Sequence, residues 1–297
     1  MRKRRLRLTP LDGAVLFCLV AFAAYLGWRV THELQYHWNW AFLPQYVLRF
    51  DERSQRWVAG LLLQGLATTV RLSLISGLLA TLLGTAMGLA RISLRPFWRM
   101  VGGGYVGLVR NVPPLVLILF FYFFIGDQIL TALHLGEGLA HISGWPLAVL
   151  EALLGPVERI LEFLSAVITL TLFEAAYITE IVRAGIQSID EGQWEASAAL
   201  GFNRRQQLFA VILPQAFQRM LPPLAGQFIS TIKDSSIVSV IAIQELTFQG
   251  QELMASTYHT FEIWIVIVSM YFLLTFSCSL AVRRLERRLA AASGSMT

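Results

Sequence analysis

Residues 190–214 read DEGQWEASAALGFNRRQQLFAVILP, a polar segment in a chain that is 56% hydrophobic. Asp190 is suited to cap a short helix at residues 191–200, and Gln193 is placed to reach back to the amide of the cap. Gly201 supplies the left-handed residue with which such a helix ends. The spacing therefore predicts a short helix with a defined beginning and end.

The second half of this segment predicts another helix. Asn203 with Gln206 repeats the cap pattern, and Pro214 is expected to end the new helix because proline has no amide with which to continue it. In the first helix, alanines leave one face almost free of side-chain bulk beside a charged glutamate, so the backbone of a partner protein can approach closely. The alternative is an amphipathic helix that lies on a membrane surface.

The whole chain has the composition of an integral membrane protein. It has 297 residues and a mean hydropathy of +0.59, and several apolar stretches reach the roughly 20 residues that cross a bilayer. The net charge of +5 does not indicate nucleic-acid binding, because the basic residues lie beside the ends of apolar stretches. Cys18 and Cys278 lie within such stretches, which favours packing residues over a disulfide or a metal site.

Hydrophobic runs predict about six transmembrane helices and an all-α membrane fold. The first run follows basic residues, as in a signal peptide, but no small-residue cleavage site precedes Trp28 and Arg29. We therefore expect a first helix that is retained. The six runs lie at residues 12–29, 63–90, 104–126, 162–183, 222–246 and 259–282.

The charges at the ends of these runs predict that both termini are cytoplasmic. In this orientation nearly all clustered basic residues face the cytoplasm, as the positive-inside rule requires. Residues 190–214 are then cytoplasmic, whereas residues 30–58, 127–161 and 247–258 face outward, with an interfacial or re-entrant helix expected in 127–161. The basic residues concerned are Arg2, Lys3, Arg4, Arg5, Arg7, Arg91, Arg95, Arg99, Arg204, Arg205, Arg219, Arg283, Arg284, Arg287 and Arg288.

Sequence motifs for ATP hydrolysis and for metal catalysis are absent. The two lysines, Lys3 and Lys233, do not lie in a GxxxxGK[ST] context, so the chain has no P-loop for ATP. HExxH and GxSxG are also absent, and the five histidines have no ligand spacing. An enzyme is therefore not expected, and any energy that the chain uses must come from another subunit.

The polar segment resembles the EAA loop of the permease subunits of bacterial ABC importers. The pattern of that loop is EAA, three residues, Gly, nine residues, Ile, one residue, Leu-Pro. Its spacing is kept here as Glu195-Ala196-Ser197, Gly201 and Val211-Ile212-Leu213-Pro214. Over about residues 58–286 the chain is similar to the polar amino acid permease subfamily. The flanking elements that carry this similarity are Arg110-Asn111-Val112-Pro113, Ala176-Tyr177-Ile178-Thr179-Glu180-Ile181-Val182-Arg183, Gly192-Gln193, Pro214-Gln215-Ala216 and Lys233-Asp234-Ser235-Ser236.

The resemblance implies the architecture of a type I ABC importer permease, with the short helix docked in a groove of a cytoplasmic ATPase subunit. It also implies a second permease subunit, identical or homologous, and an extracytoplasmic amino acid binding protein. ATP and Mg²⁺ would be bound by the ATPase, and this chain would bind no cofactor and no metal. The expected location is a bacterial plasma membrane, which is the inner membrane in a Gram-negative cell.

Within the coupling loop, the resemblance assigns a role to each matching residue. Glu195 would be the polar anchor, Ala196 and Ser197 the close-packed face, Gly201 the unobstructed turn and Pro214 the end of the following helix. The full set of expected coupling residues is Gly192, Gln193, Glu195, Ala196, Ser197, Gly201 and Pro214.

Four features depart from the family pattern. Ser197 replaces the second alanine and Val211 the isoleucine, and both changes are small enough to leave docking intact. Leu117 stands where many subfamily members have a glutamine, so any substrate contact made there is absent and the amino acid class is less secure. The outward segment 127–161 is also longer than usual.

Ionisable residues in or near the apolar runs are candidates for a substrate pathway, because they are costly in a membrane unless they are paired or face water. A free amino acid carries an ammonium and a carboxylate, and the segment 233–236 offers donors and acceptors together. Alternatively, these charges hold helices together, while Arg71 is expected to snorkel. The candidate pathway residues are Arg110, Tyr177, Glu180, Lys233, Asp234, Ser235 and Ser236.

We expect three parts: residues 1–57 with the cytoplasmic tail, the first helix and an outward segment; residues 58–286 as the transporter domain; and residues 287–297 as a cytoplasmic tail. The expected function is ATP-driven import of polar amino acids by alternating access. A permease of the same superfamily for another small solute, such as an opine, is the first alternative. A self-contained secondary transporter or channel is disfavoured by the lack of inverted-repeat signs, and a scaffold without flux by the charges within the membrane.

Overall fold

The computed structural model describes residues 10–33, 36–52, 55–134, 136, 139 and 142–294. The chain divides into two units, Met1–Ala41 and Phe42–Thr297, and the boundary predicted at residues 57 and 58 remains a prediction. In the first unit, helix α1 (Pro10–Glu33) includes an apolar stretch that is long enough to cross a membrane. The basic residues 2–7, on which the predicted sidedness partly rests, lie outside the described residues.

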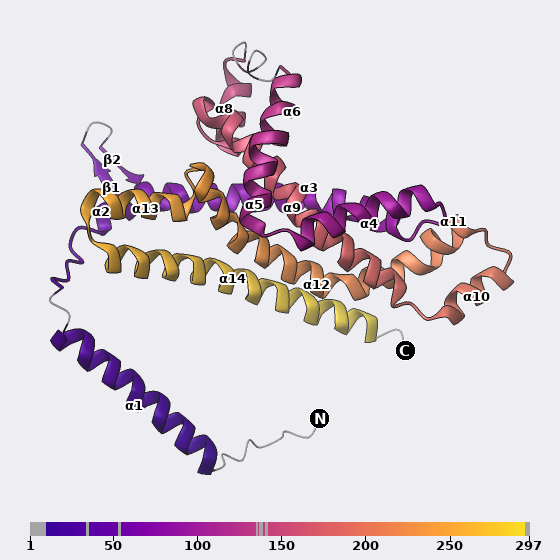
Figure 1. Ribbon diagram of the computed structural model, residues 1–297, viewed down its shortest axis with the longest axis horizontal. Coiled ribbons are helices and arrows are strands. Elements are labelled where there is room, and N and C mark those ends of the chain that lie inside the picture. The colour runs from indigo at the N-terminus through magenta and orange to yellow at the C-terminus, as the bar shows by residue number, and fades with distance from the viewer. Residues whose placement is uncertain are drawn as a thin grey trace. The chain divides into compact units, whose positions relative to one another are not determined.

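The second unit is a bundle of helices with one β-hairpin (Figure 1). Strand β1 (Leu48–Asp51) pairs antiparallel with β2 (Arg56–Ala59). Figure 1 shows this hairpin at one end of the unit, and α10 and α11 at the opposite end. The helices are α2 (Pro44–Val47), α3 (Leu61–Arg91), α4 (Pro96–Asn111), α5 (Pro114–Phe120), the π-helical turn η1 (Phe121–Gly126), α6 (Asp127–Ala132), α8 (Trp145–Leu154), the 3₁₀ turn η2 (Val157–Arg159), α9 (Ile160–Gln187), α10 (Glu191–Ala199), α11 (Arg204–Gln206), the π-helical turn η3 (Gln207–Ile212), α12 (Leu213–Asp234), the 3₁₀ segment η4 (Ser235–Ile241), α13 (Leu246–Thr257) and α14 (Thr260–Gly294).

Helices α3 and α9 pack along most of their length and run in the same direction. Gly84 of α3 faces Ile178 of α9, and four residues later Gly88 faces Val182. A Cβ atom on either glycine would lie 2.7 Å from the Cβ of its neighbour, so only glycine fits. Small residues allow such close approach between membrane helices. The buried small residues that line this face of α3 are Gly65, Thr69, Ser73, Ser76, Gly77, Ala80, Gly84 and Gly88.

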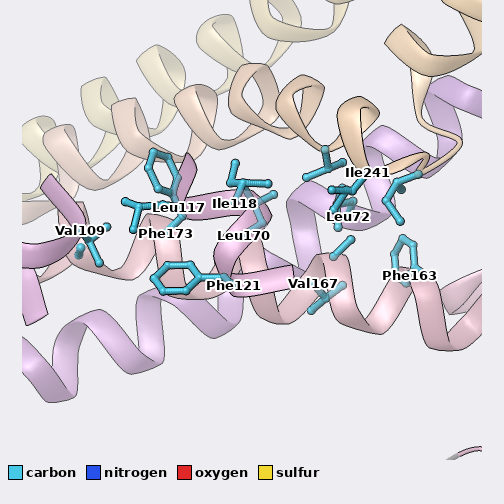
Figure 2. Packing of buried hydrophobic residues seen from close by; sticks show 14 residues of the cluster. Leu72, Val109, Leu117, Ile118, Phe121, Phe163, Val167, Leu170, Phe173 and Ile241 are labelled. Atoms are coloured by element: carbon cyan, nitrogen blue, oxygen red, sulfur yellow. The ribbon is translucent and has the colours of Figure 1, made fainter. Parts of the chain in front are cut away.

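A buried apolar cluster fills the space between α9, α5 and the segment that follows α12. Figure 2 shows Leu117, Ile118 and Phe121 beside Leu170 and Phe173 of α9. The same cluster extends to Phe163, Leu72 and Ile241 on one side and to Val109 on the other. Between helices that cross a membrane, such packing stabilises the fold through van der Waals contacts, because lipid tails are as apolar as these side chains. This cluster fixes the middle of the second unit.

Five helical stretches among the described residues are long and apolar enough to cross a membrane, which agrees with the predicted all-α membrane fold. They are Pro10–Arg29, Leu61–Arg91, Pro114–Ala132, Val157–Gln187 and Thr260–Arg284. Four of the six predicted runs, 12–29, 63–90, 162–183 and 259–282, thus agree with these stretches to within a few residues at each end.

The predicted run 104–126 is wrong in its range. Helix α4 ends at Asn111, and Val112 and Pro113 adopt extended conformations before the chain becomes helical again at Pro114. The reason is steric, because a proline disfavours the helical conformation in the residue that precedes it. The third spanning stretch therefore begins ten residues later than expected.

The predicted run 222–246 is also wrong in its range. Helix α12 begins at Leu213 and ends at Asp234, and it is not among the five apolar stretches because polar residues lie along it. Beyond Asp234 the chain forms η4, which ends at Ala242 with a left-handed φ of 60°. The segment 127–161, which the sequence predicts to face outward, contains α8, a short apolar helix in which no residue is buried.

Candidate functional site

The helix predicted within the polar segment is present as α10. The side chain of Asp190 accepts a hydrogen bond from the amide of Gly192 at 2.8 Å, which confirms the cap. Gly201 has a φ of +80°, and its amide and that of Phe202 donate to carbonyls in the last turn of α10. Gly201 thus ends the helix in the left-handed conformation that favours glycine. The prediction for Gln193 was wrong, because its Oε1 accepts from Gln215 Nε2 at 3.1 Å instead.

The second cap is also present, but Pro214 does not end the helix that follows. Asn203 Oδ1 accepts from the amide of Gln206 at 3.0 Å, and Gln206 Oε1 accepts from the amide of Asn203 at 2.9 Å. From Arg204 the chain stays helical through η3 into α12. Pro214 lies in the first turn of α12, directly after the wider π-helical turn η3, so the missing amide is accommodated there.

One face of α10 is fixed to the rest of the chain. Arg204 lies over the ring of Trp194 at 3.8 Å from its centroid, and Trp194 packs against the cluster formed by α9 and α12. Ser197 is 2% exposed, and its Oγ donates to the carbonyl of Trp194 at 2.9 Å. Ser197 is therefore a packing residue within this chain, and its hydroxyl is not on the exposed face.

The opposite face of α10 is exposed and carries little side-chain bulk. It consists of Gly192, Glu195, Ala196 and Ala199, which are spaced as one stripe of a helix. A Cβ on Gly201 would meet nothing within 4 Å, so the turn is open on the same helix. Of the predicted coupling set, Gly192, Glu195, Ala196 and Gly201 are thus available to a partner on this side, whereas Ser197 is not.

Two contacts of α12 reach α10 and the end of α9. Gln215 of α12 bonds to Gln193, as described above, and Arg219 Nη1 donates to the carbonyl of Ser188 at the end of α9. Val182 and Ile186 of α9 belong to one buried cluster with Ala216 of α12. The contacts of α10 and of the residues just before it thus reach both α9 and α12.

The predicted pathway residues fall into separate groups. Arg110 lies 5.6 Å from the ring centroid of Tyr177, so α4 and α9 bring these two together. Lys233 is exposed and Asp234 is half-buried. Ser235 Oγ and Ser236 Oγ each donate to a carbonyl one turn back at 2.7 Å, so both hydroxyls are used within their own helix.

Glu180 is placed differently from the other pathway candidates. Arg91 Nη1 donates to Glu180 Oε2, and Arg183 donates to Glu180 Oε1 through Nε at 2.9 Å and through Nη2. Arg183 also donates to Gln187. The carboxylate thus connects the end of α3 to α9, which favours the alternative reading in which this charge holds helices together. A role for Glu180 in the pathway stays a prediction.

The buried carboxyl group of Glu174 is not among the candidate pathway residues that the sequence predicts. Glu174 is fully buried in α9; its Oε2 accepts from Gln227 Nε2 of α12 at 2.7 Å, and its Oε1 has no hydrogen-bond partner within the described part of the chain. An acidic residue in the middle of an apolar run is the signal that marks it in the sequence. Leu117, where a substrate contact was expected to be missing, is buried in the apolar cluster (Figure 2).

Known proteins resemble this chain over most of its length. It is 33% identical over 227 residues to the probable glutamine ABC transporter permease GlnM of Bacillus subtilis, with 76% of this chain and 92% of that protein covered. It is 36% identical over 217 residues to the glutamine transport system permease GlnP of Escherichia coli K12, with 70% and 87% covered.

A solved structure agrees in fold. A crystal structure of an amino acid ABC transporter with histidines superposes with a TM-score of 0.61 at 31% identity, covering 77% of this chain and 94% of that one. Residues 80–291 match the family described as binding-protein-dependent transport system inner membrane component. With these matches and several apolar helices, the chain belongs to this family of multi-pass membrane permeases of ABC transporters.

Proposed function

We propose that this chain is the permease subunit of an importer that brings polar amino acids into the cytoplasm, driven by a separate ATPase. The names of the relatives support the cargo class, because GlnM and GlnP are glutamine permeases and the matching structure is an amino acid transporter. The same names disfavour an opine or another solute. A secondary transporter is disfavoured by membership of a family whose transport systems depend on a binding protein.

The observation that carries the proposal is the exposed face of α10. Gly192, Glu195, Ala196 and Ala199 lie together on it, while the opposite face is packed against η3 and tied to α9 and α12. A surface of this kind lets a partner backbone approach closely. A displacement of α10 would be transmitted through its packed face to the helices of the bundle. In this proposal a cytoplasmic ATPase docks on the exposed face.

The ATPase, as a dimer, would bind ATP and Mg²⁺, and this chain would bind neither. When the ATPases close on ATP, α10 moves with them and α9 and α12 follow, which opens the pathway outward to accept the amino acid. Hydrolysis returns the pathway to the inward state. A second permease subunit, identical or homologous, and an extracytoplasmic amino acid binding protein complete the assembly.

The orientation in this proposal has both termini in the cytoplasm of a bacterial cell, at its plasma membrane. Arg91, Arg204 and Arg219 support it, because they gather near α10 and the positive-inside rule places such residues in the cytoplasm. The amino acid would pass the Arg110–Tyr177 pair and the 233–236 segment, with Glu180 at the inner end of this path.

The test replaces one exposed alanine by a bulky residue. Ala199→Tyr fills the small face without touching the packed side of α10, so the chain should insert normally but lose ATPase co-purification and nearly all ATP-driven uptake in proteoliposomes. The matched control is Ala255→Tyr, an exposed helical position on α13. Unchanged uptake by Ala199→Tyr would overturn the coupling role of α10.

A further inference from the structure

A cavity of about 790 Å³ lies where the first turns of α3 meet the linker between α8 and α9 and the start of α13. Ala59, the last residue of the hairpin, lines it, so it belongs to the hairpin side of the second unit. A volume of this size accommodates a small molecule. Four ionisable residues line the cavity: Arg71, Glu151, Arg159 and Glu162.

Arg71, for which the sequence predicts snorkelling, is the lining residue that lies deepest along α3. It is the eleventh residue of α3, about 15 Å along the helix from its start at 1.5 Å per residue, and it is half-buried. Its guanidinium lies beside Gly155, where a Cβ would be 3.7 Å from Arg71 Nη1. The side chain is therefore directed into the cavity, towards the linker that follows α8.

The charges around the cavity are unpaired. No side-chain hydrogen bond or ion pair within the described residues involves Arg71, Arg159, Glu151 or Glu162, and all of these but the half-buried Arg71 are exposed. A guanidinium at this depth is costly unless it has a partner or faces water. These four groups differ in this respect from Glu180, which two arginines satisfy.

A buried amide adds an unfilled acceptor to the same cavity. Gln249 is 3% exposed; its Nε2 donates to Gln244 Oε1 at 3.3 Å, and its Oε1 has no partner within the described part of the chain. Both glutamines line the cavity. A buried acceptor without a donor costs about 1–3 kcal/mol, so a ligand that supplies an N–H would be favoured here.

We propose that this cavity binds the transported amino acid as a free zwitterion on the hairpin side of the permease. Arg71 pairs with the α-carboxylate, Glu151 and Glu162 attract the ammonium group, and Gln249 Oε1 accepts a hydrogen bond from an N–H of the ligand. Arginine suits this role because its planar guanidinium binds a carboxylate through two parallel hydrogen bonds. The inference rests on the proposed transport function and adds a binding site to it.

The cavity ends at the apolar cluster. Phe163 and Ile243 line the cavity and are also members of that cluster, whose other side reaches Phe173 next to Tyr177. An amino acid in the cavity is thus separated from the Arg110–Tyr177 pair by packed side chains (Figure 2). The site holds the ligand in this conformation without a continuous route across the unit.

A lipid phosphate is the other ligand that arginines in such a cavity attract. The lining carboxylates repel a phosphate, and a lipid phosphate without an amine in its head group has no N–H for Gln249 Oε1. We therefore favour the amino acid, and the experiment distinguishes the two.

The test measures binding to the complete transporter, purified in detergent with its ATPase, in the absence of ATP and of the binding protein. Equilibrium dialysis uses radiolabelled L-glutamine, L-arginine and L-glutamate. At least one should bind, and its α-carboxamide derivative should not compete. Arg71→Gln should weaken that binding by about tenfold or more, the loss expected for a charge-assisted pair. Arg71→Lys should fall between, and Gln249→Ala should weaken binding by several-fold.

Arg56→Gln, an exposed arginine of β2 outside the cavity, is the matched control and should bind as the unmodified chain does. Three results would each overturn the inference. The first is equal affinity of Arg71→Gln and the control, and the second is no binding of any of the three amino acids. The third is loss of co-purified phospholipid from Arg71→Gln while amino acid binding stays intact. Amino acid binding is measured without ATP and does not involve α10. A negative result in the Ala199→Tyr coupling test therefore does not decide the outcome of the binding test.

Discussion

The two ends of the second unit use charge in opposite ways. Two turns before the end of α9, Glu180 is bonded to Arg91 and Arg183, and Arg219 is bonded to the carbonyl of Ser188, which follows α9. On the hairpin side, the cavity is lined by Arg71, Glu162 and two further ionisable residues that have no partner among the described residues. The first arrangement holds helices together, whereas the second leaves charge available for a ligand.

This difference teaches that the role of an ionisable residue in a membrane helix follows from its partners and not from its depth. Glu180 and Arg71 both lie within apolar spanning stretches. From position alone, the sequence predicts that Glu180 lies in the substrate pathway and that Arg71 snorkels. The contacts favour helix packing for Glu180 and a ligand for Arg71, because a paired charge contributes to packing and an unpaired one needs water or a ligand.

The largest effect on stability is expected at the paired end. Glu180→Ala leaves two guanidiniums without a counter-charge, which should lower the free energy of unfolding by about 2 kcal/mol. Thermal unfolding of the detergent-purified complex, followed by size-exclusion chromatography, measures this. Glu252→Ala, at an exposed position of α13, is the control and should change stability by less than about 0.5 kcal/mol. Equal stability of the two variants would break the comparison.

A smaller loss is expected for a second satisfied carboxyl group. Glu245 is fully buried and accepts from Tyr271 Oη at 2.7 Å, from the amides of Thr247 and Phe248 at 2.9 and 2.8 Å, and from Thr69 Oγ1 at 3.3 Å. Tyr271→Phe removes one donor of four and should cost about 1 kcal/mol in the same unfolding assay. The control Tyr258→Phe, at an exposed residue, should cost nothing measurable. A neutral Tyr271→Phe would show that this contact does not hold α13 to α14.

The smallest effect on stability is expected at the cavity. Arg71→Gln removes a charge without orphaning a partner, so unfolding should shift by no more than about 0.5 kcal/mol. The same assay, with Arg56→Gln alongside, checks this. A loss above 1 kcal/mol would show that Arg71 is a packing residue and would remove the contrast with Glu180.

Local signals in the sequence predicted the functional segment better than they predicted the spans. Asp190, Gly201 and the Asn203–Gln206 pair act over a few residues, so α10 and the start of α11 were placed to within a residue. The prediction that Pro214 ends the second helix was wrong, because a π-helical turn, which depends on packing, accommodates the proline. The break at Pro113 and Pro114 was visible in the sequence and should have divided the third run.

Contacts between residues that are far apart in the chain could not be predicted from the sequence. The pairing of Glu180 with Arg91 depends on the parallel packing of α3 on α9, and the cavity needs three segments that are far apart in the chain. One signal was available: the four-residue spacing of Gly84 and Gly88 with smaller residues before them predicts a face for close helix packing.

The most direct test compares Ala199→Tyr with Arg71→Gln in one reconstituted transporter, measuring amino acid binding without ATP, ATPase co-purification and ATP-driven uptake. The account predicts that Ala199→Tyr keeps binding but loses the ATPase and uptake. Arg71→Gln should keep the ATPase but lose binding and uptake. Uptake at the unmodified rate in Ala199→Tyr would contradict the claim that α10 receives the ATP-driven movement.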